Sequence, residues 1–341
     1  MAAISNTLGR RRSSNVAVRL SRFREFGIAI FLIAIIAIMT AIKPSFLKPI
    51  NIRSILLWIP LLTVIAMGEM MVIITRGIDV SVGSILGFAG IVVGMIFRDN
   101  PGFNIYLGTL LGILLGAMLG AINGGLIAWV KIPPIITTLG TLSAFRGLVF
   151  IVSGGRQIDP NYVPTDLIRW SQRGPFGVQW IPWVVIIAAM TATLAFLFLQ
   201  YTKAGRDVYA IGGNPEAARL RGIPVARTTF LVYLITGAMS GLAGVLYASR
   251  FGFVNPGESG VGFELTVIAA VVIGGTDIFG GSGTVLGVVL GCLLLGTINV
   301  ALAVLGIAST WQLAVYGFVI LLAVTVDAII HRELRRATTG E

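Results

Sequence analysis

Three acidic side chains stand inside or directly beside long apolar runs, where a carboxylate has little access to water: Glu69, Asp79 and Asp277. A carboxylate is unfavourable in lipid, so such a residue must cap a helix, pair with a cation or face a wet cavity. Two chemistries are open to this set. Asp79 and Asp277 could share one proton as a catalytic dyad, or all three residues could relay protons or sodium ions across a membrane.

Residues needed for several enzymatic reactions are missing or misplaced. The single histidine, His331, lies in a basic tail, away from the acidic residues. Intramembrane aspartyl proteases place glycine directly before one aspartate, whereas Ile78 and Thr276 occupy those positions here. A phosphate-binding loop needs Gly-Lys followed by Ser or Thr, and none of the four lysines follows a glycine. We therefore expect no catalytic, cofactor-binding or metal-binding residues. If the protein uses ATP, we expect a partner chain to bind it.

The composition indicates a membrane protein. Hydrophobic residues make up 56% of the 341 residues and charged residues 11%, against roughly 45–50% and about a quarter in soluble domains. The net charge of +11 could suit nucleic-acid binding, but the basic residues cluster before the first apolar run and after the last. This placement is what the positive-inside rule expects of two cytoplasmic termini. The lone cysteine, Cys292, lies in an apolar run and excludes an intrachain disulfide.

The predicted fold is all-α: a polytopic bundle of about 9–10 transmembrane helices with one short cytoplasmic helix, because about 20 apolar residues span the hydrocarbon as helix. The predicted spans are residues 27–42, 55–75, 80–97, 105–130, 135–152, 180–199, 229–248, 264–274, 285–305 and 311–330. The run at 264–274 is too short to cross alone. The count therefore stays open between nine and ten.

One transmembrane domain, residues 27–330, is expected between two cytoplasmic tails, 1–26 and 331–341. Counting outward from a cytoplasmic N-terminus places the loop 154–178 in the periplasm and the loop 201–227 in the cytoplasm. The charges agree, because the inner loop has a clear excess of cations and the outer loop is nearly balanced. No segment between the spans reaches the size at which a soluble domain folds unaided.

The residues around Asp79 recur around Asp277. In residues 77–84 and 275–282, glycine, aspartate, an aliphatic residue, glycine and serine keep the same offsets. Each copy follows one apolar stretch and introduces another, which indicates a duplicated structural unit of the kind common in transporters. Either aspartate could cap the helix that follows it.

The other interpretation places polar residues of this region on a translocation pathway, and its candidates are Glu69, Asp79, Ser81 and Asp277. Glu69 is the strongest of them, because a carboxylate so deep in a span lacks an easy contact with water. Arg76 is close enough in sequence to pair with Asp79.

The cytoplasmic loop contains the signals of a short helix. Asn214 followed by Pro215 is typical of an N-cap with proline at the first helical position, and Glu216 suits the positive start of a helix. Gly222 follows two arginines and ends the helix. Taken alone, the pattern predicts a charged surface helix.

Several of these segments resemble permease subunits of ATP-binding-cassette (ABC) importers of the ribose type. Residues 212–223, Gly-Gly-Asn-Pro-Glu-Ala-Ala-Arg-Leu-Arg-Gly-Ile, are similar to the coupling loop of that family. Residues 76–84 resemble a second hallmark, usually written Gly-Gly-Ile-Asp-Leu-Ser-Val-Gly, with Arg76 where the family often has glycine. Residues 138–141 with 146–147, and residues 268–276, are also similar, so that the resemblance extends from about residue 51 to the last span.

The resemblance implies a subunit of the bacterial inner membrane that works with a second permease subunit, two ATPase subunits and a periplasmic binding protein. Its solute would be a sugar or a related small polyhydroxylated molecule. The residues implied in ATPase coupling are Gly213, Asn214, Pro215, Glu216, Ala217, Ala218, Arg219 and Gly222. An ion-coupled secondary transporter of a small polar solute remains the alternative. The pore sequence leaves open which solute is carried and whether the two permease subunits are identical.

Overall fold

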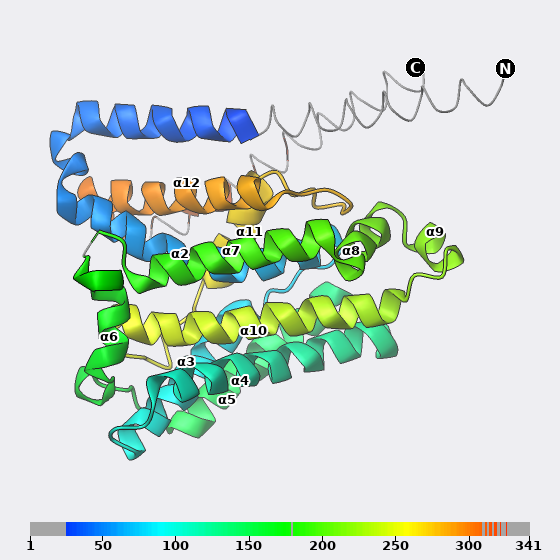
Figure 1. Ribbon diagram of the computed structural model, residues 1–341, viewed down its shortest axis with the longest axis horizontal. Helices are drawn as coiled ribbons and strands as arrows, with labels where there is room; N and C mark the ends of the chain where they lie inside the picture. Colours follow the sequence, from blue (N-terminus) through cyan, green and yellow to red (C-terminus); the bar gives the residue numbers. More distant parts are fainter. Residues whose placement is uncertain are drawn as a thin grey trace.

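The computed structural model describes residues 25–178 and 180–308, together with single positions between 311 and 325. These residues are mostly helical and contain no β-strand, apart from one isolated bridge between Ile158 and Val254. The long helices lie side by side along one direction (Figure 1). The predicted all-α polytopic fold is confirmed.

Eight helices of the described residues are long and apolar enough to cross a membrane. They are the first helix (Glu25–Ile42), α2 (Pro49–Ile74), α3 (Val82–Asp99), α4 (Ile105–Gly125, continued by the π-helical turn Leu126–Val130), α5 (Pro134–Ser153), α7 (Trp183–Tyr201), α10 (Val225–Phe251) and α12 (Val285–Val304). The shorter helices are α6 (Thr165–Gln172), α8 (Lys203–Gly213), α9 (Pro215–Leu220) and α11 (Phe263–Ile273). Short 3-10 turns cover Pro44–Leu47, Pro160–Tyr162 and Pro175–Gly177.

Nine of the ten predicted spans correspond to these eight helices and α11. With 11 residues, α11 is roughly 16 Å long, which is too short to cross the hydrocarbon. The tenth predicted span, residues 311–330, lies largely outside the described residues.

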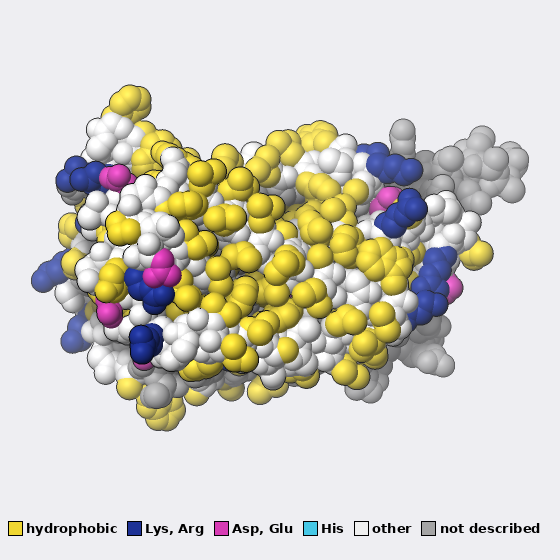
Figure 2. All heavy atoms as spheres, turned by 90° about the horizontal axis from the view of Figure 1, so that it is seen from below, with side chains coloured by type: hydrophobic (Ala, Val, Ile, Leu, Met, Phe, Trp, Pro, Cys, Tyr) yellow, Lys and Arg dark blue, Asp and Glu magenta, His cyan; other side chains and the backbone are white. Residues whose placement is uncertain are grey.

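Different short helices lie at the two ends of the bundle. At one end, the Thr284 hydroxyl donates to Glu25 of the first helix, and the Tyr209 hydroxyl of α8 donates to the Gly283 carbonyl. Helices α8 and α9 lie at this end and α6 lies at the other (Figure 1). Figure 2 shows charged side chains gathered at both ends, with a largely apolar band between them. The loops 154–178 and 201–227 therefore lie at opposite ends of the bundle.

Helix α2 runs through the centre of the bundle and packs against α7, α10, α11 and α12. Every residue from Ile59 to Ile74 is buried. Because lipid tails are as apolar as the side chains of α2, this burial is maintained by close packing and polar contacts.

Two of the membrane segments are broken. After α2 ends at Ile74, the chain turns back along it, and the Asp79 N–H donates to Glu69 Oε1 at 3.0 Å. Helix α3 therefore starts inside the bundle. Likewise, residues 252–262 run into the bundle without forming a helix before α11 begins. The two breaks meet at Gly83 and Gly260, where a Cβ on either residue would strike the carbonyl oxygen of the other.

Glycines also bring α4 and α10 into contact at the level of their backbones. A Cβ on Gly116 would meet the Gly237 carbonyl oxygen, and one on Gly120 would meet the Tyr233 carbonyl oxygen. Small residues allow such approach in lipid. The close approach fixes the heights of α4 and α10 relative to each other.

A methyl group on α4 tests this packing. We expect Gly116→Ala to lower the free energy of unfolding by about 1–3 kcal/mol, because backbone atoms of α10 occupy the space of the added Cβ. Gly27→Ala is the control, since nothing lies within 4 Å of its added Cβ. Thermal unfolding of the two purified variants measures the difference, and equal melting temperatures would contradict the packing described.

Candidate functional site

A buried polar cluster forms where the chain turns back from α2 to α3. Asp79 Oδ1 accepts from the Ser81 N–H at 2.9 Å and from the Ser81 hydroxyl at 2.6 Å. Asn123 of α4 donates to the Ser81 Oγ at 2.8 Å. Glu69, Asp79, Ser81 and Asn123 all have zero solvent exposure. The structure thus brings together three of the four predicted pathway residues, and adds Asn123.

The two aspartates of the sequence repeat order turns, and the N-cap interpretation is wrong for both. Helix α3 has Ser81 as its N-cap, and α12 is capped by Thr284, whose Oγ accepts from the Gly287 N–H. Asp79 accepts from the N–H of Ser81, and Asp277 accepts from that of Phe279. Each aspartate side chain therefore stabilises a turn by accepting from the backbone N–H two residues later in the chain, and that N–H lies in the loop before the helix.

Tyr233 of α10 completes the buried cluster. Its side chain has zero exposure, and a Cβ on Gly77 would strike its hydroxyl oxygen. Neither this hydroxyl, nor Glu69 Oε2, nor Asp79 Oδ2 has a hydrogen-bond partner among the described residues. The cluster therefore combines two carboxylates with neutral oxygen and amide groups.

Arg76 does not pair with Asp79, contrary to the sequence-based expectation. It adopts a left-handed conformation (φ 67°) at the end of α2. Its side chain donates to the carbonyl oxygens of Gly212 (2.7 Å) and Gly213 (2.8 Å) at the end of α8. The Gly281 N–H donates to the Ile74 carbonyl at 2.9 Å.

We call this contact between the end of α2, the end of α8 and the loop 277–283 the α2–α8 junction. Asp277 lies in this loop and is buried. The fourth predicted pathway residue therefore belongs to the junction and not to the buried cluster.

Helix α9 has the start and end that its sequence predicts. Asn214 Oδ1 accepts from the Ala217 N–H at 3.0 Å, Pro215 is the first helical residue, and Gly222 takes a positive φ of 75° after the helix. Glu216 and Arg219 form an exposed ion pair at 3.3 Å. Helix α9 therefore presents a preformed charged surface at the end of the bundle.

A second polar group links α5 to the other break. Arg146 of α5 donates to the Ser259 carbonyl at 2.8 Å. The Glu264 carboxylate lies against Gly83, in the first turn of α3. The sequence placed Glu264 at the start of a predicted span but did not single it out, although an acidic residue at that position is itself a signal.

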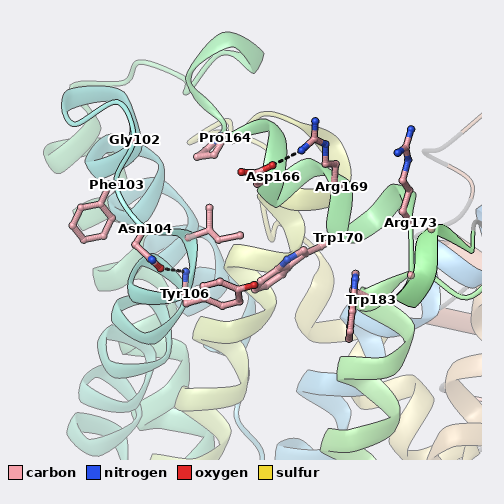
Figure 3. A pocket seen from close by; sticks show the side chains of 13 residues that line it. Gly102, Phe103, Asn104, Tyr106, Pro164, Asp166, Arg169, Trp170, Arg173 and Trp183 are labelled. Carbon is pink, nitrogen blue, oxygen red and sulfur yellow. Dashed lines mark hydrogen bonds and ion pairs between the residues drawn. The ribbon is translucent and has the colours of Figure 1, made fainter.

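The opposite end of the bundle contains a cavity of about 610 Å³ between the start of α4, α6 and the start of α7. Figure 3 shows Tyr106 and Trp170 side by side, with ring centroids 5.9 Å apart. The Asp166–Arg169 ion pair lies on the rim (2.5 Å). Aromatic rings beside exposed charges are typical of a membrane–water interface.

The described fold and these sites define a polytopic membrane protein with broken spans, a buried polar centre and a preformed helix exposed at one end. Residues 51–324 match the family described as the branched-chain amino acid transport system permease component. The chain belongs to this family. It is a permease subunit of an ABC importer in the bacterial inner membrane, and so a transport component that works with a separate ATPase.

Relatives match over most of their length. The autoinducer 2 import system permease protein LsrC of Photorhabdus luminescens is 36% identical over 318 residues, which cover 93% of this chain and 94% of the relative. The ribose import permease protein RbsC of Bacillus subtilis is 40% identical over 308 residues, 89% of this chain and 92% of the relative. No solved structure matches the chain. These relatives lend no support to the alternative of an ion-coupled transporter.

The left-handed conformation of Arg76 gives a test of the α2–α8 junction. Arg76→Ala removes both hydrogen bonds to α8 and keeps the backbone strain, so we expect a loss of about 1–3 kcal/mol in the free energy of unfolding. Arg76→Gly should lose about 1 kcal/mol less, because glycine adopts this conformation freely.

Lys131 is the matched control, because it is also left-handed (φ 65°) and exposed. The free energy of unfolding of Lys131→Gly should exceed that of Lys131→Ala by the same amount, about 1 kcal/mol. Thermal unfolding of the four variants separates the strain from the hydrogen bonds. An Arg76→Gly variant less stable than Arg76→Ala would contradict this account.

Proposed function

We propose that the chain forms, together with a second permease subunit, the pathway through which a sugar or related small polyhydroxylated solute enters the cell. A periplasmic binding protein delivers the solute, and two ATPase subunits supply the energy. The observation that carries this proposal is the preformed α9, exposed at one end and tied through α8 to the central helix α2. The names of the autoinducer 2 and ribose relatives support the solute class.

Helix α9 is the surface that docks into the ATPase. The coupling residues are Gly213, Asn214, Pro215, Glu216, Ala217, Ala218, Arg219 and Gly222. Helix α8 transmits the movement, because Arg76 holds its end to α2 and the Tyr209 hydroxyl holds it to the Gly283 carbonyl at 2.9 Å. Burial raises the pKa of Tyr209, which keeps this hydroxyl a donor at physiological pH. Closure of the ATPase thus moves the inner ends of the spans as a rigid body.

In this arrangement α9 and both termini are cytoplasmic, and the loop 154–178 is periplasmic. The cytoplasmic loop carries the excess of positive charge that this orientation favours. The aromatic cavity of Figure 3 then lies at the periplasmic surface, where the binding protein docks.

The second permease subunit packs on α5. Gly140, Ser143, Ala144 and Gly147 form an exposed stripe of small residues on this helix, and a Cβ at either glycine would meet nothing within 4 Å. Small residues at such spacing favour helix association in lipid. The solute passes between the two subunits along α5.

The buried cluster shapes this pathway from behind α5. The Thr138 hydroxyl of α5 donates to the Ile78 carbonyl at 3.1 Å, which joins α5 to the turn that Glu69, Asp79 and Ser81 hold in place. Asp277 acts at the α2–α8 junction, where the loop 277–283 contacts the end of α2. Movement of α2 therefore reaches α5 through the turn.

Loss of Glu69 tests this part of the proposal. Glu69→Ala removes the acceptor of the Asp79 N–H deep in the bundle, so we expect uptake of labelled ribose in vesicles to fall several-fold per molecule of inserted protein. Asp159→Ala is the control, because this partly exposed side chain has, among the described residues, a side-chain hydrogen bond to the exposed Gln157 alone. Equal effects of the two substitutions on uptake would refute the pathway role.

Charge reversal tests the docking helix. Exchanging the charges of α9 with Glu216→Arg and Arg219→Glu should retain the helix but abolish both co-purification of the ATPase and uptake, because the surface presented to the partner is inverted. The matched control is Asp166→Arg with Arg169→Asp, the equivalent ion pair of α6 at the opposite end. This control should leave the ATPase bound. If the α9 exchange leaves both ATPase association and solute accumulation intact, the proposed mechanism is wrong.

A further inference from the structure

Four buried oxygen atoms from four segments lack a hydrogen-bond partner among the described residues. They are Glu69 Oε2 of α2, Asp79 Oδ2 of the turn, Asn123 Oδ1 of α4 and the Tyr233 hydroxyl of α10. All four side chains have zero solvent exposure. Native proteins rarely leave buried polar atoms unpaired, and buried charges are paired or coordinate metals. The cluster therefore calls for a bound group that satisfies these oxygens.

The hydrogen bonds of the cluster place these oxygens close together. Asn123 donates to Ser81, Ser81 donates to Asp79, and the Asp79 N–H donates to Glu69, so that one chain of contacts links three of the four side chains. The fourth, Tyr233, packs its hydroxyl against Gly77, two residues before Asp79. In Glu69, Asp79 and Asn123, one side-chain polar atom takes part in these hydrogen bonds or accepts from the turn, and the other has no partner among the described residues.

The cationic side chains of Arg76, Arg146 and Lys131 are directed elsewhere. The Arg76 guanidinium donates to the carbonyl groups of Gly212 and Gly213. Arg146 donates to the Ser259 carbonyl, on the far side of the Gly83–Gly260 contact. Lys131 is exposed. Two carboxylates enclosed in protein without a cationic partner repel each other, so a positive charge must come from outside the chain.

We propose that Glu69, Asp79, Asn123 and Tyr233 bind one dehydrated monovalent metal cation, Na⁺ or K⁺, at the break between α2 and α3. Carboxylate, amide and hydroxyl oxygens are hard ligands that suit such ions. The described residues contain no group of three acidic, histidine or cysteine side chains. Two carboxylates that share one enclosed site do not both ionise, so the site has one negative charge, which a monovalent ion neutralises. The cation joins α2, α4 and α10 at the turn that they enclose.

A cavity leads toward this site from the α9 end of the bundle. It has a volume of about 390 Å³, and its walls include Thr75, Gly77, Lys131 and Tyr233. The Tyr233 ring and the Gly77 backbone thus separate the cavity from the two carboxylates. The proposed cation stabilises the fold, and this inference does not depend on which solute the chain carries.

The single cysteine offers a direct assay. Cys292 is fully buried in α12, so a thiol-reactive dye reports unfolding of the purified full-length permease. The melting temperature is measured in NaCl or KCl, with choline chloride added to hold the ionic strength constant. We expect a saturable rise of several degrees with one or both metal ions. Identical melting temperatures in NaCl, KCl and choline chloride, or a rise that requires Ca²⁺ or Mg²⁺, would overturn the proposal.

Variants locate the effect. Tyr233→Phe removes one oxygen and keeps the ring, so we expect the cation concentration for half of the rise to increase about tenfold, the equivalent of about 1.4 kcal/mol. Tyr247→Phe, on the same helix and also buried, should respond as the wild type does. Glu69→Gln should abolish the response. If both Tyr233→Phe and Glu69→Gln respond as the wild type does, the cation binds elsewhere and the proposed site is wrong. If the melting temperature varies with pH but not with cation identity, a proton and not a metal ion supplies the positive charge at Glu69 and Asp79, and the proposal is wrong.

Discussion

Backbone N–H and carbonyl groups find no water inside a bilayer, and the structure depends on how the two broken spans meet this constraint. Residues 75–81 and 252–262 interrupt the regular helices of the bundle. Where these segments are buried, side chains supply the partners: Glu69 accepts from the Asp79 N–H, and Arg146 donates to the Ser259 carbonyl. The polar side chains of the interior are therefore structural requirements of the breaks.

The same constraint explains why glycine is so abundant at the helix contacts. The side chains that meet at the turn come from α4 and α10, which approach each other very closely, and only residues without a side chain permit contacts such as Gly116 with Gly237. These contacts in turn set the heights of Asn123 and Tyr233, which project into the cluster from α4 and α10. Backbone packing and polar chemistry are thus two parts of one arrangement.

Local signals predicted the features that local chemistry determines. The start of α9 at Asn214 and Pro215 follows from hydrogen bonds within four residues, and the long spans follow from hydropathy alone. The partners of the buried cluster did not follow, because Asn123 lies 42 residues from Ser81 in the chain. An asparagine inside an apolar run was a usable signal. Nothing in the sequence near Tyr233 marks it, since its position depends on how α10 packs.

The repeat around Asp79 and Asp277 shows how one local motif can serve two different surroundings. Both aspartates accept from the N–H two residues ahead, so the turn itself is shared. In the first copy the turn faces Glu69 and Asn123 in the buried centre, whereas the second copy contacts Ile74 at the α2–α8 junction. The turns therefore hold α2 at two levels, one beside α5 and one beside α8. A rigid helix held at both levels cannot shift at one without shifting at the other, which is the property that coupling between distant surfaces requires.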